Sequence, residues 1–342
     1  MHAFAFSAHG GPEVTAHVDV PVPVPGPGEL LVRMAASGVN PGDVKVRSGG
    51  RQGAFEVRFP MAIGREAAGD VVTVGDGVDG WVPGDAVFGA AAAGTGTLAD
   101  LVLLTAESVA RRPDGVSPEQ ATCIPVSVGT AWDALDELDL PAGSTLLVLG
   151  AGGGVGSAAC AIAVGRGLTV IGVASAGKRQ LVEDLGAVHV VSGDGWTDRV
   201  RALTTDGIVD GVIDLVGGDV LRDAVALVRD QGAIRSGAAP RLATELGGSG
   251  VTRRRTTAVF TAIAEAIAAG AFRAVVSGTW PLAQAEHAVA AVEDGHATGN
   301  VVVVADGPAS DGQPSDTEPA VASVSDASPS KPAHDRTPTS GP

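Results

Sequence analysis

A cluster of glycines at residues 150–156 gives the clearest chemical signal in the sequence. The apolar run Thr145–Leu149 precedes the cluster and the run Thr169–Ala174 follows it, which predicts two buried parallel strands joined by a helix. Glycines in a turn out of a strand let the backbone approach a pyrophosphate, because no Cβ stands in the way. The helix that follows then offers its free N–H groups to the anion. The alternative is a glycine-rich connection that binds no ligand.

The order of strand, turn, helix and strand favours a nicotinamide dinucleotide as the ligand. The predicted cofactor cradle consists of Gly150, Ala151, Gly153, Gly154, Val155 and Gly156. Proteins that select NAD place an acidic residue about 20 positions beyond the glycines, on the ribose 2′-hydroxyl. No Asp or Glu occurs here from residue 141 to residue 182.

The second predicted strand is followed by Ser175, Lys178 and Arg179. A hydroxyl and two cations suit a 2′-phosphate, because hydrogen bonds from cations to phosphate are charge-assisted. The predicted cofactor is therefore NADPH. The alternative is that Lys178 and Arg179 only begin a solvated helix.

The remaining chain must supply a scaffold for these groups. After residue 118, predicted strands alternate with predicted helices, which is typical of a doubly wound parallel sheet. The strands are expected at 188–191, 212–216 and 233–236, and the helices at 198–203 and 220–228. Before residue 118, short strands and Gly, Pro and Asp turns indicate a compact, partly barrel-like β domain with a loop at 38–50. The fold class is predicted to be α/β.

Composition narrows the function further. The chain has 342 residues and a net charge of −16, which argues against nucleic acid as a partner and gives no sign of a membrane-binding face. Cys123 and Cys160 have no metal-ligand spacing, so we expect neither a disulfide framework nor a secreted protein. No signal peptide is recognisable, and the expected location is cytoplasmic. Residues 306–342 are rich in Pro and Ser and predict a disordered tail.

Six passages taken together resemble a known family. They are GVNPGDVKVRSG at 38–49, IGREAAGDVVTVGDGVDGWVPGDAVFG at 63–89, GTAWDAL at 129–135, GAGGGVG at 150–156, DGVIDLVGG at 210–218 and WPLAQAEHAVAAVEDGHATGNVVVV at 280–304. Nearly all of residues 1–305 is similar to the medium-chain dehydrogenase/reductase superfamily, in its zinc-free, zeta-crystallin-like quinone oxidoreductase branch. The resemblance implies a GroES-like, β-rich substrate domain from residues 1–120 and 272–305. A Rossmann cofactor domain is implied for residues 121–271.

The resemblance also implies roles for single residues outside the glycine turn. Asn40 and Thr130 match residues that lie beside the nicotinamide, and Gly237 matches backbone that passes close to its ring. The alternatives are a turn-stabilising Asn40 before Pro41 and a helix N-cap role for Thr130. Asn300 stands where relatives usually have a lysine, so a family cation at the cofactor site is lost.

The proton donor is where this sequence departs most from the resemblance. Relatives often have tyrosines at the positions of Lys45 and Arg51, whereas this chain contains no tyrosine. Protonation of an enolate then falls to Lys45, Asp43 or water. The alternative for Lys45 is an ordinary surface lysine. A quinone tolerates the loss of a tyrosine better, because its reduced oxygens can take protons from solvent.

No metal is expected. Zinc-containing members of the superfamily have a Cys in the loop that matches residues 38–43 and a His just before the residue that matches Glu66. This chain has Val39, Asn40 and Pro41 in the first place and Arg65 in the second, so a catalytic zinc would lack its ligands.

The predicted function is NADPH-dependent, zinc-independent hydride transfer to a quinone or an α,β-unsaturated carbonyl compound, by a chain that the resemblance implies to be a homodimer. One alternative is an enoyl-thioester or polyketide enoyl reductase, although the sequence shows no obvious basic cluster for the phosphates of coenzyme A. The other is a cofactor-binding protein with little turnover.

Overall fold

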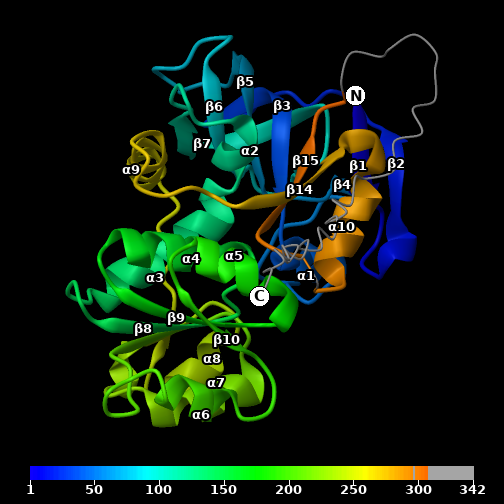
Figure 1. The fold of residues 1–342 in the computed structure, drawn as a ribbon. Helices are drawn as coiled ribbons and strands as arrows, with labels where there is room; N and C mark the ends of the chain where they lie inside the picture. Colours follow the sequence, from blue (N-terminus) through cyan, green and yellow to red (C-terminus); the bar gives the residue numbers. More distant parts are fainter. Residues whose placement is uncertain (296, 307–342) are drawn as a thin grey trace, which may run out of the picture. The chain divides into compact units, whose positions relative to one another are not determined.

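The computed structural model of the chain describes residues 1–295 and 297–306 (Figure 1). The predicted disordered tail therefore lies outside the described residues, except for Asp306. The described residues form three sheets. The smallest has the order β2-β1-β4 and consists of β1 (His2–Phe6), β2 (Thr15–Asp19) and β4 (Met61–Ala62).

The second sheet is mixed and has six strands in the order β14-β15-β3-β5-β6-β7. Its strands are β3 (Glu29–Val39), β5 (Glu66–Val74), β6 (Ala86–Ala91), β7 (Leu101–Arg111), β14 (Val276–Pro281) and β15 (Asn300–Val304). A further pairing of β3 with β7 folds this sheet towards a barrel, as the short strands and turns predict. The C-terminal strand β15 pairs with β3, so the end of the described chain returns to the N-terminal strands.

The third sheet is entirely parallel and has the order β10-β9-β8-β11-β12-β13. Its strands are β8 (Thr145–Leu149), β9 (Thr169–Ala174), β10 (Val188–Val191), β11 (Gly211–Asp214), β12 (Ile234–Ser236) and β13 (Ser249–Gly250). The strand order reverses between β8 and β11. Ligands of such sheets bind outside the carboxyl ends of the strands at this switch point.

Helices cover both faces of the parallel sheet (Figure 1). Along β8, Leu146 and Val148 pack against α4, whereas Leu147 and Leu149 pack in the separate cluster that contains residues of α6, α7 and α8. The α-helices of the described residues are α1 (Pro41–Arg47), α2 (Pro118–Thr122), α3 (Gly129–Leu138), α4 (Gly154–Gly165), α5 (Arg179–Asp184), α6 (Trp196–Arg201), α7 (Gly218–Ala224), α8 (Pro240–Glu245), α9 (Thr257–Ala268) and α10 (Ala285–Glu293). Both faces of β8 are therefore buried against helices, which explains why its sequence is a continuous apolar run.

The predicted loop at 38–50 is wrong for most of its length. Strand β3 continues to Val39 and helix α1 starts at Pro41, where a proline fits the first turn. Asn40 and Asp43 form a capping box at this start, and the Asn40 N–H donates to Asp43 Oδ2 over 2.8 Å. The strand therefore leads directly into a helix, and Asn40 is fixed at the junction.

Candidate active site

The glycine turn connects β8 to α4 as predicted. Gly150 has a φ of 83°, which favours glycine, and Gly153 is the N-cap of α4. A Cβ on Gly156 would lie 2.1 Å from Gly150 O, so the helix packs on the turn too closely for any side chain there. A Cβ on Gly153 would meet no protein atom closer than 3.7 Å. Gly153 therefore leaves free space at the start of the helix, where an anion would bind.

The strand-entry segment before β15 lies over this turn. Gly299 N donates to Gly152 O over 2.9 Å. Asn300 Nδ2 donates to Val275 O over 2.9 Å, and Ser127 Oγ donates to Asn300 Oδ1. A cavity of about 280 Å³ remains between the two segments, lined by Asn40, Gly150, Gly153, Gly154, Val155, Gly156, Lys178 and Asn300, among others. The structure thus gathers most of the predicted cofactor residues around one cavity.

The three predicted phosphate ligands after β9 are placed differently from one another. Lys178 lines the cavity, where its Nζ donates to Ala297 O over 2.7 Å and partial burial lowers its pKa. Ser175 and Arg179 are exposed, and Arg179 forms an i,i+4 ion pair with Glu183 at 3.3 Å. Only Lys178 of this group is therefore brought into the cavity at the glycine turn.

A second cavity, of about 160 Å³, continues from the first. Both are lined by Asn40, Pro41, Val155 and Leu215, and the second adds Lys45, Thr130 and Gly237. Thr130 lies inside the first turn of α3 rather than at its N-cap, which is Val128, so the N-cap interpretation of Thr130 is wrong. Its hydroxyl donates to Val126 O.

Gly237 follows β12, and a Cβ there would lie 3.1 Å from Leu215 Cδ2 and 3.8 Å from Thr130 Cγ2. The backbone of Gly237 therefore passes close to Thr130 across the second cavity. Asp214 holds the neighbouring strand ends in place, since it accepts from Gly217 N over 2.8 Å and from Ser236 Oγ over 2.6 Å.

Glu66 is a buried carboxyl group beside Asn40 that was not among the predicted site residues. Asn40 Nδ2 donates to Glu66 Oε1 over 2.6 Å, and Val126 N donates to Glu66 Oε2 over 2.8 Å. Burial raises the pKa of Glu66 to about 8, although the two hydrogen bonds oppose the shift. Val126 lies in a π-helical turn at Ile124–Val128, a feature that often occurs at functional sites.

The two candidate proton donors on α1 have opposite environments. Asp43 is buried, accepts from the Asn40 N–H and pairs with Arg65 Nε at 2.7 Å, so its carboxylate is occupied by donors. Lys45 is exposed and lines the second cavity beside Arg51. Of the two side chains, the structure brings Lys45 to the cavity.

A third and wider cavity, of about 770 Å³, adjoins the second. Arg51, Gly237, Ala238 and Arg253 line both. Its lining also includes Arg222 of α7 and Arg241 of α8. The basic cluster that was not obvious in the sequence therefore exists in the fold, because arginines from four distant segments meet at the carboxyl end of β12.

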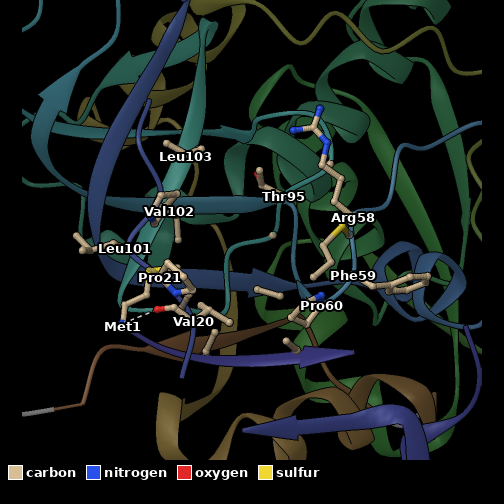
Figure 2. Close-up of a pocket in the computed structure, with 18 residues that line it drawn as sticks. Met1, Val20, Pro21, Arg58, Phe59, Pro60, Thr95, Leu101, Val102 and Leu103 are labelled. Carbon is tan, nitrogen blue, oxygen red and sulfur yellow. Dashed lines mark hydrogen bonds between the residues drawn. The ribbon is translucent and has the colours of Figure 1, made fainter. Parts of the chain in front are cut away.

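Another cavity, of about 300 Å³, is shown in Figure 2. Mostly apolar residues of the N-terminal strands and their neighbours surround it, including Met1, Val20, Pro60 and Val102. None of the predicted site residues lines it. The predicted site residues that line a cavity are therefore found at the three connected cavities and not at this one.

Over residues 1–295 and 297–306, no three side chains of His, Cys, Asp or Glu lie together in a way that could hold a metal ion. In the same part of the chain, no helix has the length and apolar character needed to cross a membrane.

Two family descriptions match the chain. "Alcohol dehydrogenase GroES-like domain" matches residues 26–114, and "Zinc-binding dehydrogenase" matches residues 185–303. Together they span the strands of the mixed sheet and much of the parallel sheet.

Solved structures show the same fold over nearly the whole chain. A mycobacterial protein described as complexed with NADPH is 33% identical, covers 89% of this chain and 100% of its own, and has a TM-score of 0.78. The quinone oxidoreductase of Coxiella burnetii is 26% identical, covers 90% of this chain and 99% of its own, and has a TM-score of 0.81.

A third relative is much longer than this chain. The mycocerosic acid synthase-like polyketide synthase of Mycolicibacterium smegmatis is 35% identical over 205 residues, which are 59% of this chain and 10% of the synthase. This chain therefore spans about a tenth of that relative. Together with the fold and the three connected cavities, these matches show that the chain belongs to the medium-chain dehydrogenase/reductase superfamily, in its quinone-oxidoreductase-like branch of NAD(P)H-dependent oxidoreductases.

Proposed function

We propose that this enzyme uses NADPH, without zinc, to transfer hydride to a quinone or an α,β-unsaturated carbonyl compound. The observation that supports this proposal is the continuous path from the glycine turn to the cavity of Asn40, Thr130 and Gly237. The pyrophosphate would lie at Gly153, and the reactive ring would lie in the second cavity. Reduced nicotinamide supplies the hydride when it is bound, and the protein aligns donor and acceptor.

The chain's own residues in the second cavity suit an acceptor that gains negative charge. The Asn40 amide offers a hydrogen-bonding group at the cavity wall, and Lys45, Arg51 and Arg253 surround the same space with positive charge. Such groups stabilise an oxyanion that develops as hydride arrives at a conjugated carbonyl or quinone. Val155 and Leu215 provide an apolar wall that limits access of water.

The direct test follows the loss of NADPH absorbance with a panel of quinones and enones. We expect turnover with at least one class, at a rate well above that of the enzyme without acceptor. NADPH binding without oxidation by any member of the panel would contradict the proposal. Equal turnover after metal chelation is expected for a zinc-independent enzyme, and loss of turnover that added zinc restores would contradict it.

The preference for NADPH is proposed to depend mainly on Lys178. In Lys178→Ala we expect the Kd for NADPH to rise at least tenfold and the Kd for NADH less than threefold, because only NADPH has the 2′-phosphate. Arg179→Ala should have a smaller effect, since Arg179 is exposed and paired with Glu183. Fluorescence titration of the unaltered enzyme and both variants with each nucleotide measures the six dissociation constants. Equal affinities for NADPH and NADH in the unaltered enzyme would contradict the preference.

Lys45 is proposed as the group that protonates the reduced enone. Lys45→Met should lower kcat for an enone at least tenfold, and kcat for a quinone less than threefold, because the reduced quinone takes protons from solvent. Arg201→Gln, which removes an exposed cation of α6, should change neither. Stopped-flow measurement with both acceptors checks this, and similar losses with both would remove Lys45 from the role.

We also propose that the chain forms a homodimer, as the family resemblance implies. The parallel sheet ends at β13, a strand of two residues that pairs on one side with β12. Light scattering of the purified chain measures its mass in solution directly.

A further inference from the structure

The third cavity is lined by arginines that have little pairing of their own. Within residues 1–295 and 297–306, the guanidinium groups of Arg51, Arg241 and Arg253 form no salt bridge and no hydrogen bond. Arg222 has a loose contact with Asp219 at 3.9 Å. Among the described residues of the lining, Glu245 is the carboxylate that faces these four cations. The cavity therefore has a marked excess of positive charge in a chain whose net charge is −16.

Repulsion acting on Arg253 adds to the charge imbalance. Desolvation lowers the pKa of Arg253 to about 10, although the residue is exposed at the surface, and the nearby Arg255, Arg65 and Arg51 contribute to this lowering. Arg255 lies next to this group, and its Nε and Nη2 are buried without a hydrogen-bond partner among the described residues. Guanidinium groups that repel one another around an open space are relieved when an anion binds between them.

The position of the third cavity separates it from the phosphates of the cofactor. The glycine turn and Lys178 lie at the ends of β8 and β9, whereas Arg222 and Arg241 lie beyond the ends of β11 and β12, on the other side of the switch point. The second cavity, with Asn40 and Gly237, stands between the two regions. A dinucleotide that enters from the glycine turn reaches the second cavity with its nicotinamide end, so its phosphates stay on the far side.

We propose that the cavity lined by Arg51, Arg222, Arg241 and Arg253 binds the phosphate groups of the hydride acceptor, whose reactive double bond extends into the adjoining cavity of Asn40 and Gly237. This inference rests on the proposed function and specifies its substrate class. The acceptor is an α,β-unsaturated acyl thioester on a phosphorylated arm, and not a simple quinone.

The number and spacing of the arginines favour phosphate over a single carboxylate. One guanidinium is enough to hold a carboxylate in two parallel hydrogen bonds. Four guanidinium groups around about 770 Å³ suit an extended group with several negative charges. The volume is about five times that of the second cavity, which is consistent with a small reactive end and a bulky charged arm.

The test compares acceptors that share one reactive group and differ in the arm. Three crotonyl thioesters serve this purpose. Crotonyl-coenzyme A carries a nucleotide polyphosphate, crotonyl-4′-phosphopantetheine carries one phosphate monoester, and crotonyl-N-acetylcysteamine carries no phosphate. We expect kcat/KM to fall at least tenfold from the first to the last, and the difference to shrink as ionic strength rises. Equal kcat/KM for coenzyme A and N-acetylcysteamine thioesters would overturn the inference.

Variants on α7 and α8 assign the effect to the cavity. The double variant Arg222→Gln, Arg241→Gln should lose at least tenfold in kcat/KM with crotonyl-coenzyme A and less than threefold with the N-acetylcysteamine thioester, which lacks the group that these arginines bind. Arg201→Gln, outside the cavity, should resemble the unaltered enzyme with both. Equal losses with both thioesters in the double variant would overturn the inference.

A phosphopantetheine arm can also be attached to a carrier protein, and the same assay separates the two sources. Better turnover of crotonyl-coenzyme A than of a crotonylated carrier protein assigns the subsite to the free nucleotide arm, and the reverse assigns it to the carrier-bound arm. Inhibition by free coenzyme A that is competitive with NADPH, and unaffected by the double variant, would place the phosphates in the cofactor site and contradict the inference.

The failure of this inference is distinguishable from failure of the proposed function. If quinones or simple enones oxidise NADPH but no thioester does, only the substrate class is wrong. If no acceptor oxidises NADPH, the proposed function itself fails.

Discussion

Gly153→Ala is expected to raise the Kd for NADPH about thirtyfold, a loss of about 2 kcal/mol, while the thermal unfolding of the free protein stays unchanged. The reason is that a Cβ at residue 153 meets no protein atom closer than 3.7 Å, yet Gly153 lines the cavity at the start of α4. The added methyl group would therefore contact the pyrophosphate and not the protein. Fluorescence titration and calorimetry measure the two quantities.

Gly156→Ala provides the matched comparison within the same turn. Its Cβ would lie 2.1 Å from Gly150 O and 2.8 Å from Ala151 Cα, so the backbone of the turn must move. We expect this variant to lose about 1–3 kcal/mol of stability and to bind NADPH weakly for that reason. Unimpaired NADPH binding by Gly153→Ala would show that the pyrophosphate does not lie at the N-terminus of α4.

The parts of the fold that the sequence predicted well are those determined by local pattern. The strands Thr145–Leu149 and Thr169–Ala174 and the turn between them follow from one apolar run, one glycine cluster and one run of small residues. The helix at Pro41–Arg47 was missed because its start depends on a capping box within a sequence rich in turn residues. Local signals at this point favour both a turn and a helix start, and the contact of α1 with α10 favours the helix.

The parts of the site that the sequence did not reveal depend on contacts between distant segments. Glu66 meets Asn40 and Val126 only because β5 pairs with β3 and lies beside the turn at Ile124–Val128. One cavity is lined by Arg51, Arg222 and Arg241, although up to 190 positions separate them in the sequence. A run such as residues 253–255 could signal a basic site, but sequence alone does not show which other cations join it.

We expect Glu66 and Asn40 together to make the second cavity sensitive to pH. While Glu66 is ionised, it accepts from Asn40 Nδ2, so the Asn40 oxygen is the end left for the cavity. The Val126 N–H holds Oε2 as an acceptor, so a proton on Glu66 belongs on Oε1 and faces Asn40. The Asn40 amide is then expected to turn its oxygen to this proton and its NH₂ group to the cavity. An NH₂ group stabilises an acceptor oxygen that becomes negative, and a carbonyl oxygen does not. We therefore expect the protonated state of Glu66 to be the active one.

We expect kcat/KM with an enone to fall about tenfold between pH 7 and pH 9, because the pKa of Glu66 is about 8 and the protonated fraction falls by that factor. Glu66→Gln has an NH₂ group in place of the hydroxyl, so it should keep the active arrangement of Asn40 and lose this pH dependence. Glu107→Gln, at an exposed position, should retain the profile of the unaltered enzyme. A profile of Glu66→Gln that still falls between pH 7 and pH 9 would contradict the role of Glu66.

The same pair predicts the direction of a stability change. The pKa of Glu66 is raised in the folded state from an ordinary value of 4.5 to about 8, so the folded protein binds this proton more tightly than the unfolded chain. The stability gained from protonation is full below pH 4.5 and is lost as the pH rises to 8, because the unfolded chain releases the proton first. Between these two pH values, each rise of one pH unit lowers the free energy of unfolding by about 1.4 kcal/mol.

Denaturant unfolding at pH 5 and pH 8 measures this loss of stability. It should be smaller for Glu66→Gln than for the unaltered enzyme, since glutamine does not titrate. Folding stability is measured without cofactor or acceptor, so this result tests the buried pair independently of the reaction. An equal loss in both proteins would mean that Glu66 is already ionised at pH 5, and the pH dependence of turnover would then need another titrating group.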